Sequence, residues 1–184
     1  MKKLNLLILI AIITCACDNI KKEPIDYVNT FIGTGGHGHT YPGATLPFGM
    51  MQLSPDTRLE GWDGCGGYHF SDSIIYGFSH THLSGTGISD YGDILLMPTS
   101  GKIKLTNGVK ESKNSKNTIN QLGYSSKFSH LNETSSPGYY QVLLQDYNIN
   151  VELTTALRSG IHKYTFNSND SANIILDLQH RDKL

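Results

Sequence analysis

Short runs of β-branched and aromatic residues, separated by turn signals, dominate the last third of the chain. The turn signals are rich in Asn, Asp, Ser and Gly, and they set the runs about 8–12 residues apart. In one run Val151, Leu153 and Thr155 alternate with polar residues, as in a strand that buries one face. The four runs are Gly138–Gln145, Ile149–Leu157, Ile161–Phe166 and Ala172–Leu178. This spacing predicts an all-β fold, an antiparallel sandwich or barrel.

The first part of the chain continues the same pattern more weakly. Only Ile25–Phe31 favours a short helix. Thr106–Gln121 has little apolar content, which predicts an exposed loop or a hairpin tip. The earlier strand candidates are Phe48–Leu53, Ser73–Ser79 and Asp93–Pro98. There is no internal repeat, and 184 residues are enough for one domain with a core of its own.

The N-terminus has the layout of a bacterial export signal. Lys2 and Lys3 precede an apolar run over Leu4–Ile13, which is too short for a membrane span of about 20 residues. Cys17, preceded by Ala16, resembles the lipidated residue of a bacterial lipobox. A plain secretory signal, cut near Ala16, is the alternative.

These features predict three regions. We expect residues 1–16 to be a lipoprotein signal peptide, residues 17–24 to be the lipidated cysteine with a polar tether, and residues 25–184 to be the folded domain. Two or more acyl chains on Cys17 would anchor the protein to a membrane, in the periplasm or on the outer-membrane surface of a bacterium. Cys65 would then be the only cysteine in the folded part, so we expect no internal disulfide.

The segment between Gly33 and Gly92 is rich in glycine and histidine and poor in cations. It holds 14 of the 19 glycines and five of the eight histidines, and Arg58 is the only Lys or Arg between Glu23 and Gly101. With a net charge of −1, the chain lacks the basic excess of a nucleic-acid-binding protein. Many neutral polar groups with few cations suit a neutral ligand such as a sugar.

One motif in this segment, Gly33–Gly38, matches the dinucleotide fingerprint GxGxxG letter by letter. A dinucleotide site needs a strand before the glycines and a helix after them, whose N-terminus holds the pyrophosphate. Pro42 and Pro47 follow closely, and no helical periodicity is present. The motif therefore indicates a glycine-shaped loop rather than a nucleotide site.

Two His-x-His pairs, His37-Gly38-His39 and His80-Thr81-His82, raise the question of a metal. On a strand, residues i and i+2 share a face, so either pair could present two imidazoles to one ion. The possible further ligands are Asp63, Asp90 and Cys65. The spacing matches no strong zinc signature. Histidines satisfied by buried hydrogen bonds, or histidines that line a ligand cleft, are the alternatives.

Trp62, the only tryptophan, lies beside Asp63 in a glycine-rich loop. A flat apolar ring can stack on the C–H face of a sugar, while neighbouring Asp, His and Thr exchange hydrogen bonds with its hydroxyls. Packing in the core is the alternative for Trp62. A carboxylate pair for glycoside hydrolysis could be sought among Asp56, Glu60, Asp63, Asp90 and Asp93. The sequence does not place two of them across one bond.

Long segments of the chain resemble the start of glycoside hydrolase family 92. These segments are Asp26–Met50, Gln52–Thr57, Gly61–Asp63, Gly67–His69, Gly77–Gly87, Asp90–Ile94, Pro137–Tyr140 and Ile174–Leu178. One departure is Gly64, where we expect the family to carry a large aromatic residue. The wall of the sugar pocket should therefore differ at this point.

The resemblance implies an exported, exo-acting α-mannosidase that trims mannose from N-glycans or mannan. It also implies an antiparallel β-sandwich followed by an (α/α)6 barrel, with calcium-dependent, inverting chemistry. In the family the acid, the base and most calcium ligands lie in the barrel, so we expect no catalytic residue and no metal ligand in this chain. The N-terminal domain would contribute loops to the sugar pocket.

We therefore expect Trp62, Asp63, His80, Thr81 and His82 to contact the mannose-containing glycan, and His37 and His39 mainly to shape their loop. The chain stops soon after a strand, so we expect the N-terminal part of a longer enzyme, inactive alone. A stand-alone carbohydrate-binding lipoprotein without hydrolase activity is the alternative, and a non-functional fragment is a third. The mannosidic linkage and the oligomeric state stay open.

Overall fold

The computed structural model describes residues 22–108 and 123–181 and is built from antiparallel strands with three short 3-10 helices in that part of the chain. Residues 1–16 and Cys17 lie outside the described residues, as does most of the loop expected at Thr106–Gln121. No helix within the described ranges is long and apolar enough to cross a membrane. The 3-10 helices are η1 (Pro24–Tyr27), η2 (Trp62–Gly64) and η3 (His130–Asn132).

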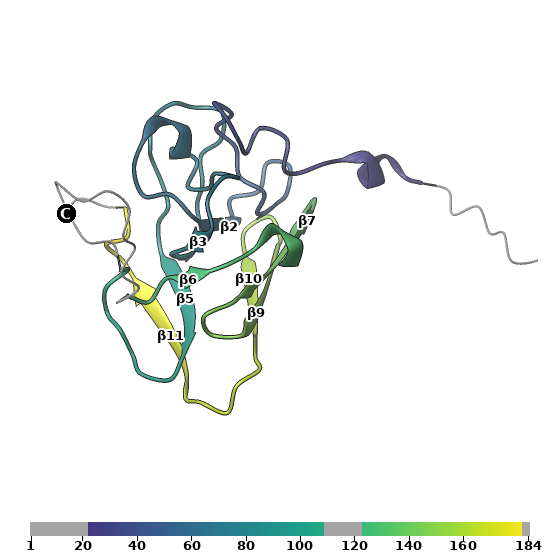
Figure 1. The fold of residues 1–184 in the computed structure, drawn as a ribbon. Coiled ribbons are helices and arrows are strands. Elements are labelled where there is room, and N and C mark those ends of the chain that lie inside the picture. The colour runs from purple at the N-terminus through teal and green to yellow at the C-terminus, as the bar shows by residue number, and fades with distance from the viewer. Residues whose placement is uncertain (1–21, 109–122, 182–184) are drawn as a thin grey trace, which may run out of the picture.

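The larger sheet has five strands in the order β1-β2-β4-β5-β11. Its last neighbours, β5 and β11, run side by side at one edge (Figure 1). The strands are β1 (Ala44–Thr45), β2 (Gln52–Asp56), β4 (Gly77–Ser79), β5 (Leu95–Ser100) and β11 (Ala172–Asp177).

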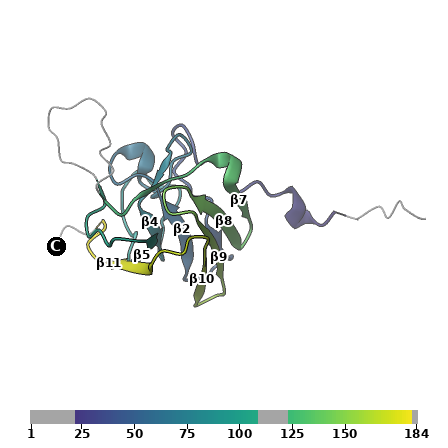
Figure 2. The same cartoon turned by 60° about the horizontal axis from the view of Figure 1, so that its bottom comes forward.

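A second sheet has four strands in the order β10-β9-β8-β7, so it is a meander of neighbours in sequence. Its strands are β7 (Glu133–Ser136), β8 (Tyr139–Leu144), β9 (Ile149–Thr155) and β10 (Gly160–Phe166). A small third sheet pairs β3 (Ile74–Ile75) with β6 (Ser126–Lys127). Figure 2 shows β2 of the first sheet beside β9 of the second, where the two sheets pack together.

The core lies between these two sheets and confirms the predicted antiparallel sandwich. Leu53 on β2 and Val142, Val151 and Leu153 on β8 and β9 have no exposed surface. The first residue of β10, Gly160, lies close to β2, since a Cβ atom at this position would be 2.6 Å from Leu53 Cδ1. The alternation predicted at Val151 and Leu153 is present along β9, and β8 alternates in the same way.

Both faces of the five-stranded sheet are covered near its centre. Phe78 and Leu96 are paired across β4 and β5, so they share the face that looks into the sandwich. Leu95 and Met97 point the other way and are also fully buried. On that side the Tyr124 hydroxyl donates to Asp177 Oδ2 at 2.5 Å. This second layer explains why β5 is apolar on both faces.

At its β11 edge, the inward face of the same sheet is exposed. Leu176 is paired with Leu96, and Ile174 with Pro98, so both lie on the same face as Phe78. Yet Ile174 and Leu176 are 58% and 55% exposed, because β10 ends the second sheet before it reaches them. The sandwich is therefore open on this side.

The predicted strands after residue 124 are confirmed, with ends that shift by one or two residues. The strand expected at Phe48–Leu53 begins later, at Gln52, because a turn occupies the first residues. In that turn Gly49 N–H donates to Leu46 O at 2.9 Å, and Phe48 has a positive φ of 58° and is fully exposed. The predicted helix is only the single turn of η1, which begins at Pro24.

Candidate sugar-binding site

Three loops from the glycine-rich segment meet at one end of the sandwich. The loop from Thr57 to Gly67 is closed at its base, where the N–H groups of Thr57 and Arg58 both donate to Gly67 O, at 2.8 and 3.1 Å. Arg58 braces the loop, since its Nη2 lies 2.5 Å from Asp72 Oδ1. The third loop, residues 80–94 between β4 and β5, is joined to the first loop, residues 28–43 before β1, through Gly85 N–H, which donates to His39 O at 2.7 Å.

Trp62 and Asp63 lie next to two histidines of the first loop. The Trp62 ring meets the edge of His39 at a centroid distance of 4.3 Å and lies 5.8 Å from His37. His37 Nδ1 is 2.7 Å from Asp63 Oδ1. Trp62 is 59% exposed, so it is not a core residue. We call Trp62, Asp63, His37 and His39 the Trp62 cluster.

Charge and hydrogen bonding make this cluster rich in both donors and acceptors. The hydrogen bond from His37 lowers the pKa of Asp63, which keeps its carboxyl group an acceptor at neutral pH. The His39 side chain is 7% exposed and its Nε2 has no hydrogen-bond partner among the described residues. That nitrogen lies 4.0 Å from Asp63 Oδ1, so one hydroxyl oxygen could contact both atoms.

Small residues make room for the indole. A Cβ atom at Gly87 would lie 2.2 Å from Trp62 Nε1, so the third loop can pass under Trp62 only as glycine. A side chain at Gly64 would lie 2.3 Å from Arg58 Cδ, so the aromatic residue expected there in the family does not fit this arrangement. Behind the cluster the Cys65 thiol donates to Thr86 O at 2.6 Å.

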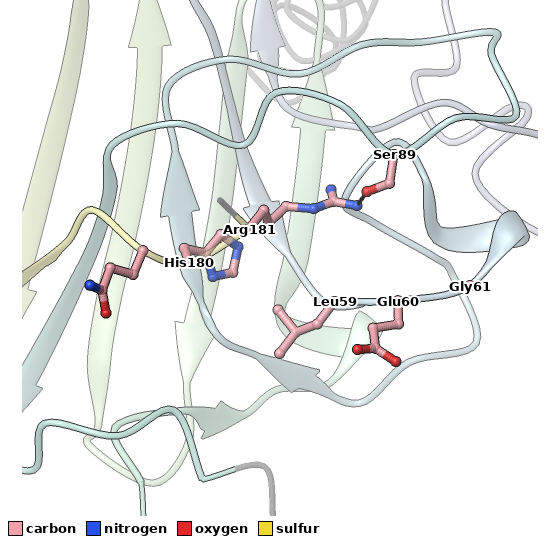
Figure 3. A pocket seen from close by; sticks show the side chains of 7 residues that line it. Leu59, Glu60, Gly61, Ser89, His180 and Arg181 are labelled. Atoms are coloured by element: carbon pink, nitrogen blue, oxygen red, sulfur yellow. Dashed lines mark hydrogen bonds between the residues drawn. The ribbon is translucent and has the colours of Figure 1, made fainter. Parts of the chain in front are cut away.

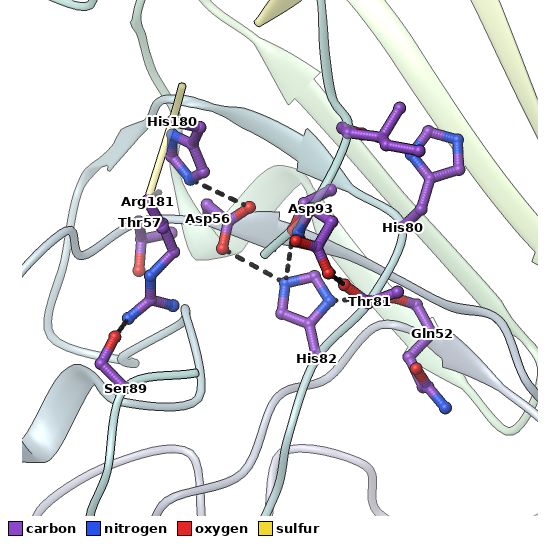
Figure 4. Close-up of polar contacts among 12 residues, drawn as sticks. Gln52, Asp56, Thr57, His80, Thr81, His82, Ser89, Asp93, His180 and Arg181 are labelled. Carbon is purple, nitrogen blue, oxygen red and sulfur yellow. Dashed lines mark hydrogen bonds and ion pairs between the residues drawn. The ribbon is translucent and has the colours of Figure 1, made fainter. Parts of the chain in front are cut away.

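His82, one of the predicted sugar contacts, has its side chain inside the protein. Its Nε2 lies 3.2 Å from Asp56 Oδ1 and its Nδ1 lies 2.8 Å from Gln52 O, and neither His82 nor Asp56 has exposed side-chain surface. Figure 4 shows His82 on one side of the Asp56 carboxylate and His180 on the other. The imidazole therefore does not join the Trp62 cluster at the surface.

The pKa of Asp56 follows from these two neighbours. Burial alone would raise it, but the positive charges of His82 and His180 hold it well below its usual range. Asp56 therefore stays ionised inside the protein.

His80 and Thr81 fix the two ends of the third loop. The Thr81 hydroxyl donates to Asp93 Oδ2 at 2.7 Å, and His80 Nδ1 donates to Ile94 O at 2.5 Å. The His80 ring also packs on His162 at a centroid distance of 4.8 Å. The structure thus brings together Trp62 and Asp63 of the predicted contacts, while the side chains of His80 and Thr81 are engaged within their own loop.

His37 and His39 are the members of the cluster for which the sequence suggested mainly a loop-shaping role. The sequence marks these two residues as a His-x-His pair in a glycine-rich loop. Their separation from Trp62 along the sequence does not predict that the three rings lie close together in the fold. Across residues 22–108 and 123–181, no group of three or more His, Cys, Asp or Glu side chains is placed to hold a metal ion.

Comparison with known proteins settles the family. The model of the glycosyl hydrolase family 92 N-terminal domain matches residues 27–183. The chain belongs to glycosyl hydrolase family 92. The predicted resemblance is therefore confirmed, and the sandwich is the N-terminal domain of this family.

Two solved family 92 structures show how much of the fold is shared. An α-mannosidase from Bacteroides thetaiotaomicron, solved with mannoimidazole, is 43% identical with a TM-score of 0.77, over 86% of this chain and 20% of that one. An inverting mannosidase from the same organism is 28% identical with a TM-score of 0.67, over 85% and 20% of the two chains.

A sequence relative from the fungus Arthroderma benhamiae, described as an uncharacterized secreted glycosidase, is 30% identical over 150 residues. That match covers 81% of this chain and 18% of the relative. The chain thus spans about a fifth of the length of these relatives.

Proposed function

We propose that this chain serves as the N-terminal domain of an inverting, calcium-dependent α-mannosidase that trims mannose from N-glycans or mannan. Its role would be to supply the Trp62 cluster to the sugar pocket. The observation that carries the proposal is the exposed Trp62 ring beside an ionised Asp63, in a chain 43% identical to a solved α-mannosidase.

The cluster has the chemistry that a neutral sugar needs. The exposed part of Trp62 offers an apolar platform for sugar C–H groups, Asp63 accepts hydrogen bonds from hydroxyls, and His39 Nε2 is a polar atom still without a partner. No Lys or Arg belongs to the cluster. This composition favours an uncharged ring with several hydroxyl groups.

We assign no acid, base or metal step to this chain. An inverting glycosidase needs two carboxyl groups about 6.5–9.5 Å apart, but Asp56 is buried between histidines and Asp93 accepts from Thr81. Calcium takes 6–8 oxygen ligands, and no cluster in the described ranges fits it. We propose that the acid, the base and the calcium donors come from outside this chain, which alone would be inactive.

The proposal includes export and a membrane anchor. Residues 1–16 would direct secretion and Cys17 would carry the lipid, as the sequence predicts. A relative described as secreted supports export. Labelling cells with a fatty-acid analogue, with Cys17→Ser as the unlabelled control, tests the anchor.

Sugar binding can be followed through Trp62 itself. As the only tryptophan, it is the only source of indole fluorescence, so mannobiose should change the emission of the purified chain and should release heat in calorimetry. Trp62→Ala should abolish the heat, whereas Tyr27→Ala, which removes another exposed aromatic ring, should not. Binding that survives Trp62→Ala would show that the pocket lies elsewhere.

A stand-alone carbohydrate-binding lipoprotein is the second candidate, because the Trp62 cluster is already exposed in this chain. The two candidates differ in what accompanies the domain. The DNA downstream of the Leu184 codon should encode a helical barrel in some frame if the enzyme proposal holds. If nothing related follows and the chain still binds mannobiose, the second candidate holds instead.

A further inference from the structure

A polar cavity separate from the Trp62 cluster lies where the segment after β11 meets the loops of the glycine-rich segment. It has a volume of about 720 Å³ and is shown in Figure 3. Its lining residues are Leu59, Glu60, Gly61, Ser89, Gln179, His180 and Arg181. We call it the Arg181 cavity, because its chemistry depends on the guanidinium group of that residue.

The three arginines of the chain have very different partners. Arg58 has a carboxylate, since its Nε and Nη2 both donate to Asp72, at 3.2 and 2.5 Å. Arg158 is exposed in the turn between β9 and β10. Arg181 is part-buried and bonds only to the hydroxyl of Ser89, while its Nε is buried with no hydrogen-bond partner in the described part of the chain.

The guanidinium group of Arg181 therefore has fewer hydrogen-bond acceptors around it than it has N–H donors. No carboxylate among the described residues forms an ion pair with it. Glu60 lines the same cavity, but it is exposed, and Figure 3 shows its carboxylate directed away from the guanidinium group. A part-buried guanidinium group without an anion is costly, and an oxyanion is the partner whose geometry it matches best.

His180 gives the second, independent sign of a ligand. Its side chain is 1% exposed and lines the cavity, and neither ring nitrogen has a hydrogen-bond partner among the described residues. Its Nε2 lies 3.3 Å from Asp56 Oδ2, near enough for a charge interaction but not aligned for a hydrogen bond. The Nδ1 atom of His180 thus has unused hydrogen-bonding capacity.

The carboxylate of Asp56 does not pair with Arg181, because its two oxygens face His82 and His180. His82 Nε2 lies 3.2 Å from Asp56 Oδ1 and 3.1 Å from Ser79 Oγ, and His82 Nδ1 lies 2.8 Å from Gln52 O. The positive charge of Arg181 is left over.

We propose that the Arg181 cavity binds an oxyanion, a phosphate or a carboxylate group, through the Arg181 guanidinium with His180 beside it. Charge-assisted bonds from a guanidinium group to such oxygens are short and directional. The Trp62 cluster, built for an uncharged ring, has no part in holding the anion.

The direct test is a titration with inorganic phosphate, at constant ionic strength set by chloride, followed through the Nε–H signals of arginine in nitrogen-15 NMR. The chain has three arginines, and Arg181→Gln identifies the third signal. We expect the Arg181 signal to move and saturate while those of Arg58 and Arg158 stay in place. An unchanged Arg181 signal, or equal movement of all three, would overturn the proposal.

Variants give a second readout. Arg181→Gln should weaken phosphate binding, measured by calorimetry, about tenfold or more. Arg158→Gln removes the same charge from an exposed turn and should leave the affinity unchanged. If both variants bind phosphate as the unmodified chain does, the site is not at Arg181. The NMR titration follows the unmodified chain, and Arg181→Gln enters it only to assign the signal.

The source of the anion can be separated with four probes: inorganic phosphate, acetate, mannose 6-phosphate and mannose. Tighter binding of mannose 6-phosphate than of inorganic phosphate would identify an anion carried on a sugar, and equal binding a free anion. Tighter binding of acetate would identify a carboxylate. A response of Arg181 to mannose alone, with none to the anions, would overturn the proposal.

Discussion

The histidines of this chain differ sharply in what surrounds their rings. The side chain of His37 is 81% exposed, whereas that of His82 has no exposed surface. His162 lies between these extremes on β10, with its Nδ1 accepting from the Tyr164 hydroxyl at 2.8 Å and its Nε2 buried without a partner among the described residues. Burial first, and the charge of His80 second, lower the pKa of His162 to about 4.

This lowered pKa predicts an acid-sensitive fold. The unfolded chain takes up the proton near the ordinary pKa of 6.5, before the folded chain does, so stability is full above that pH and is lost as the pH falls toward 4. Between about pH 7.5 and about pH 5, the free energy of unfolding should fall by about 2 kcal/mol because of His162. Urea unfolding at both pH values measures it, with His162→Gln losing less stability than the unmodified chain. An equal loss in His162→Gln would contradict the assignment to His162.

At the level of single elements, the loop from Thr57 to Gly67 depends on its last residue. Gly67 has a φ of 88°, and a Cβ there would lie 2.4 Å from Asp56 Oδ1 and 2.9 Å from the His82 ring. Gly61, in the same loop, has a φ of 96° but no atom within 4 Å of the Cβ position. The two glycines therefore share the backbone requirement and differ only in the space available.

This pair predicts two different costs. Gly61→Ala should destabilise by about 1 kcal/mol, from the left-handed backbone alone. Gly67→Ala should cost about 3 kcal/mol, because the methyl group must also displace a buried ion pair. Thermal unfolding of both variants measures the difference. Equal costs would mean that the Asp56–His82 pair moves aside without penalty.

β7 illustrates an element whose importance lies in one polar side chain. Glu133 is almost fully buried and accepts from Tyr140 at 2.6 Å and from Tyr68 at 3.1 Å, while His130 Nδ1 lies 2.6 Å away. The carboxylate therefore joins β7 to β8 and to the segment before β3. A strand of sequence Glu-Thr-Ser-Ser is held in the sheet by this network rather than by apolar packing.

Glu133→Gln should destabilise the protein by about 3 kcal/mol, since the amide cannot accept from all its neighbours and leaves buried donors unpaired. Glu152→Gln, on β9 of the same sheet, removes a carboxylate whose partner Lys163 is 67% exposed and should have little effect. Urea unfolding compares the two. Similar losses in both variants would contradict a special role for Glu133.

On the scale of the whole molecule, the open side of the sandwich should govern self-association. Ile174 and Leu176 expose apolar side chains at a sheet edge, an arrangement prone to association. Leu176→Lys should lower self-association, measured by light scattering, with little change in thermal stability. Leu131→Lys, at an isolated residue that is 94% exposed, should leave association unchanged. Association that Leu176→Lys does not reduce would place the contact elsewhere.

The sequence could predict the elements with strong alternation and not those held by polar contacts. β9 follows from a period-two pattern, β8 follows from a run of aromatic and β-branched residues between turn signals, and the family follows from long matched segments. β7 has no apolar residue, and β1 and β6 are two residues long, so pattern gives no signal for them. Such strands form because their neighbours position them.

The candidate site shows the same limit. The pairing of Trp62 with Asp63 is local and could be predicted, whereas the positions of His37 and His39 beside them depend on how two loops fold over the sheet. His82 was predicted as a sugar contact because it shares a motif with His80, but its side chain is buried against Asp56. The residue that directs it inward, Asp56, lies 26 residues away in sequence.

The position of Asp56 between His82 and His180 also constrains the order of folding. A chain that emerges N-terminus first presents Asp56 and His82 early and His180 last, as it does β5 before its partner β11. Until residue 180 has emerged, burying Asp56 leaves one carboxylate oxygen without its cation, which disfavours early closure of the sheet. His180 therefore completes the contacts of Asp56 late in folding. The five-stranded sheet should become fully stable only when the segment that carries His180 has packed against Asp56.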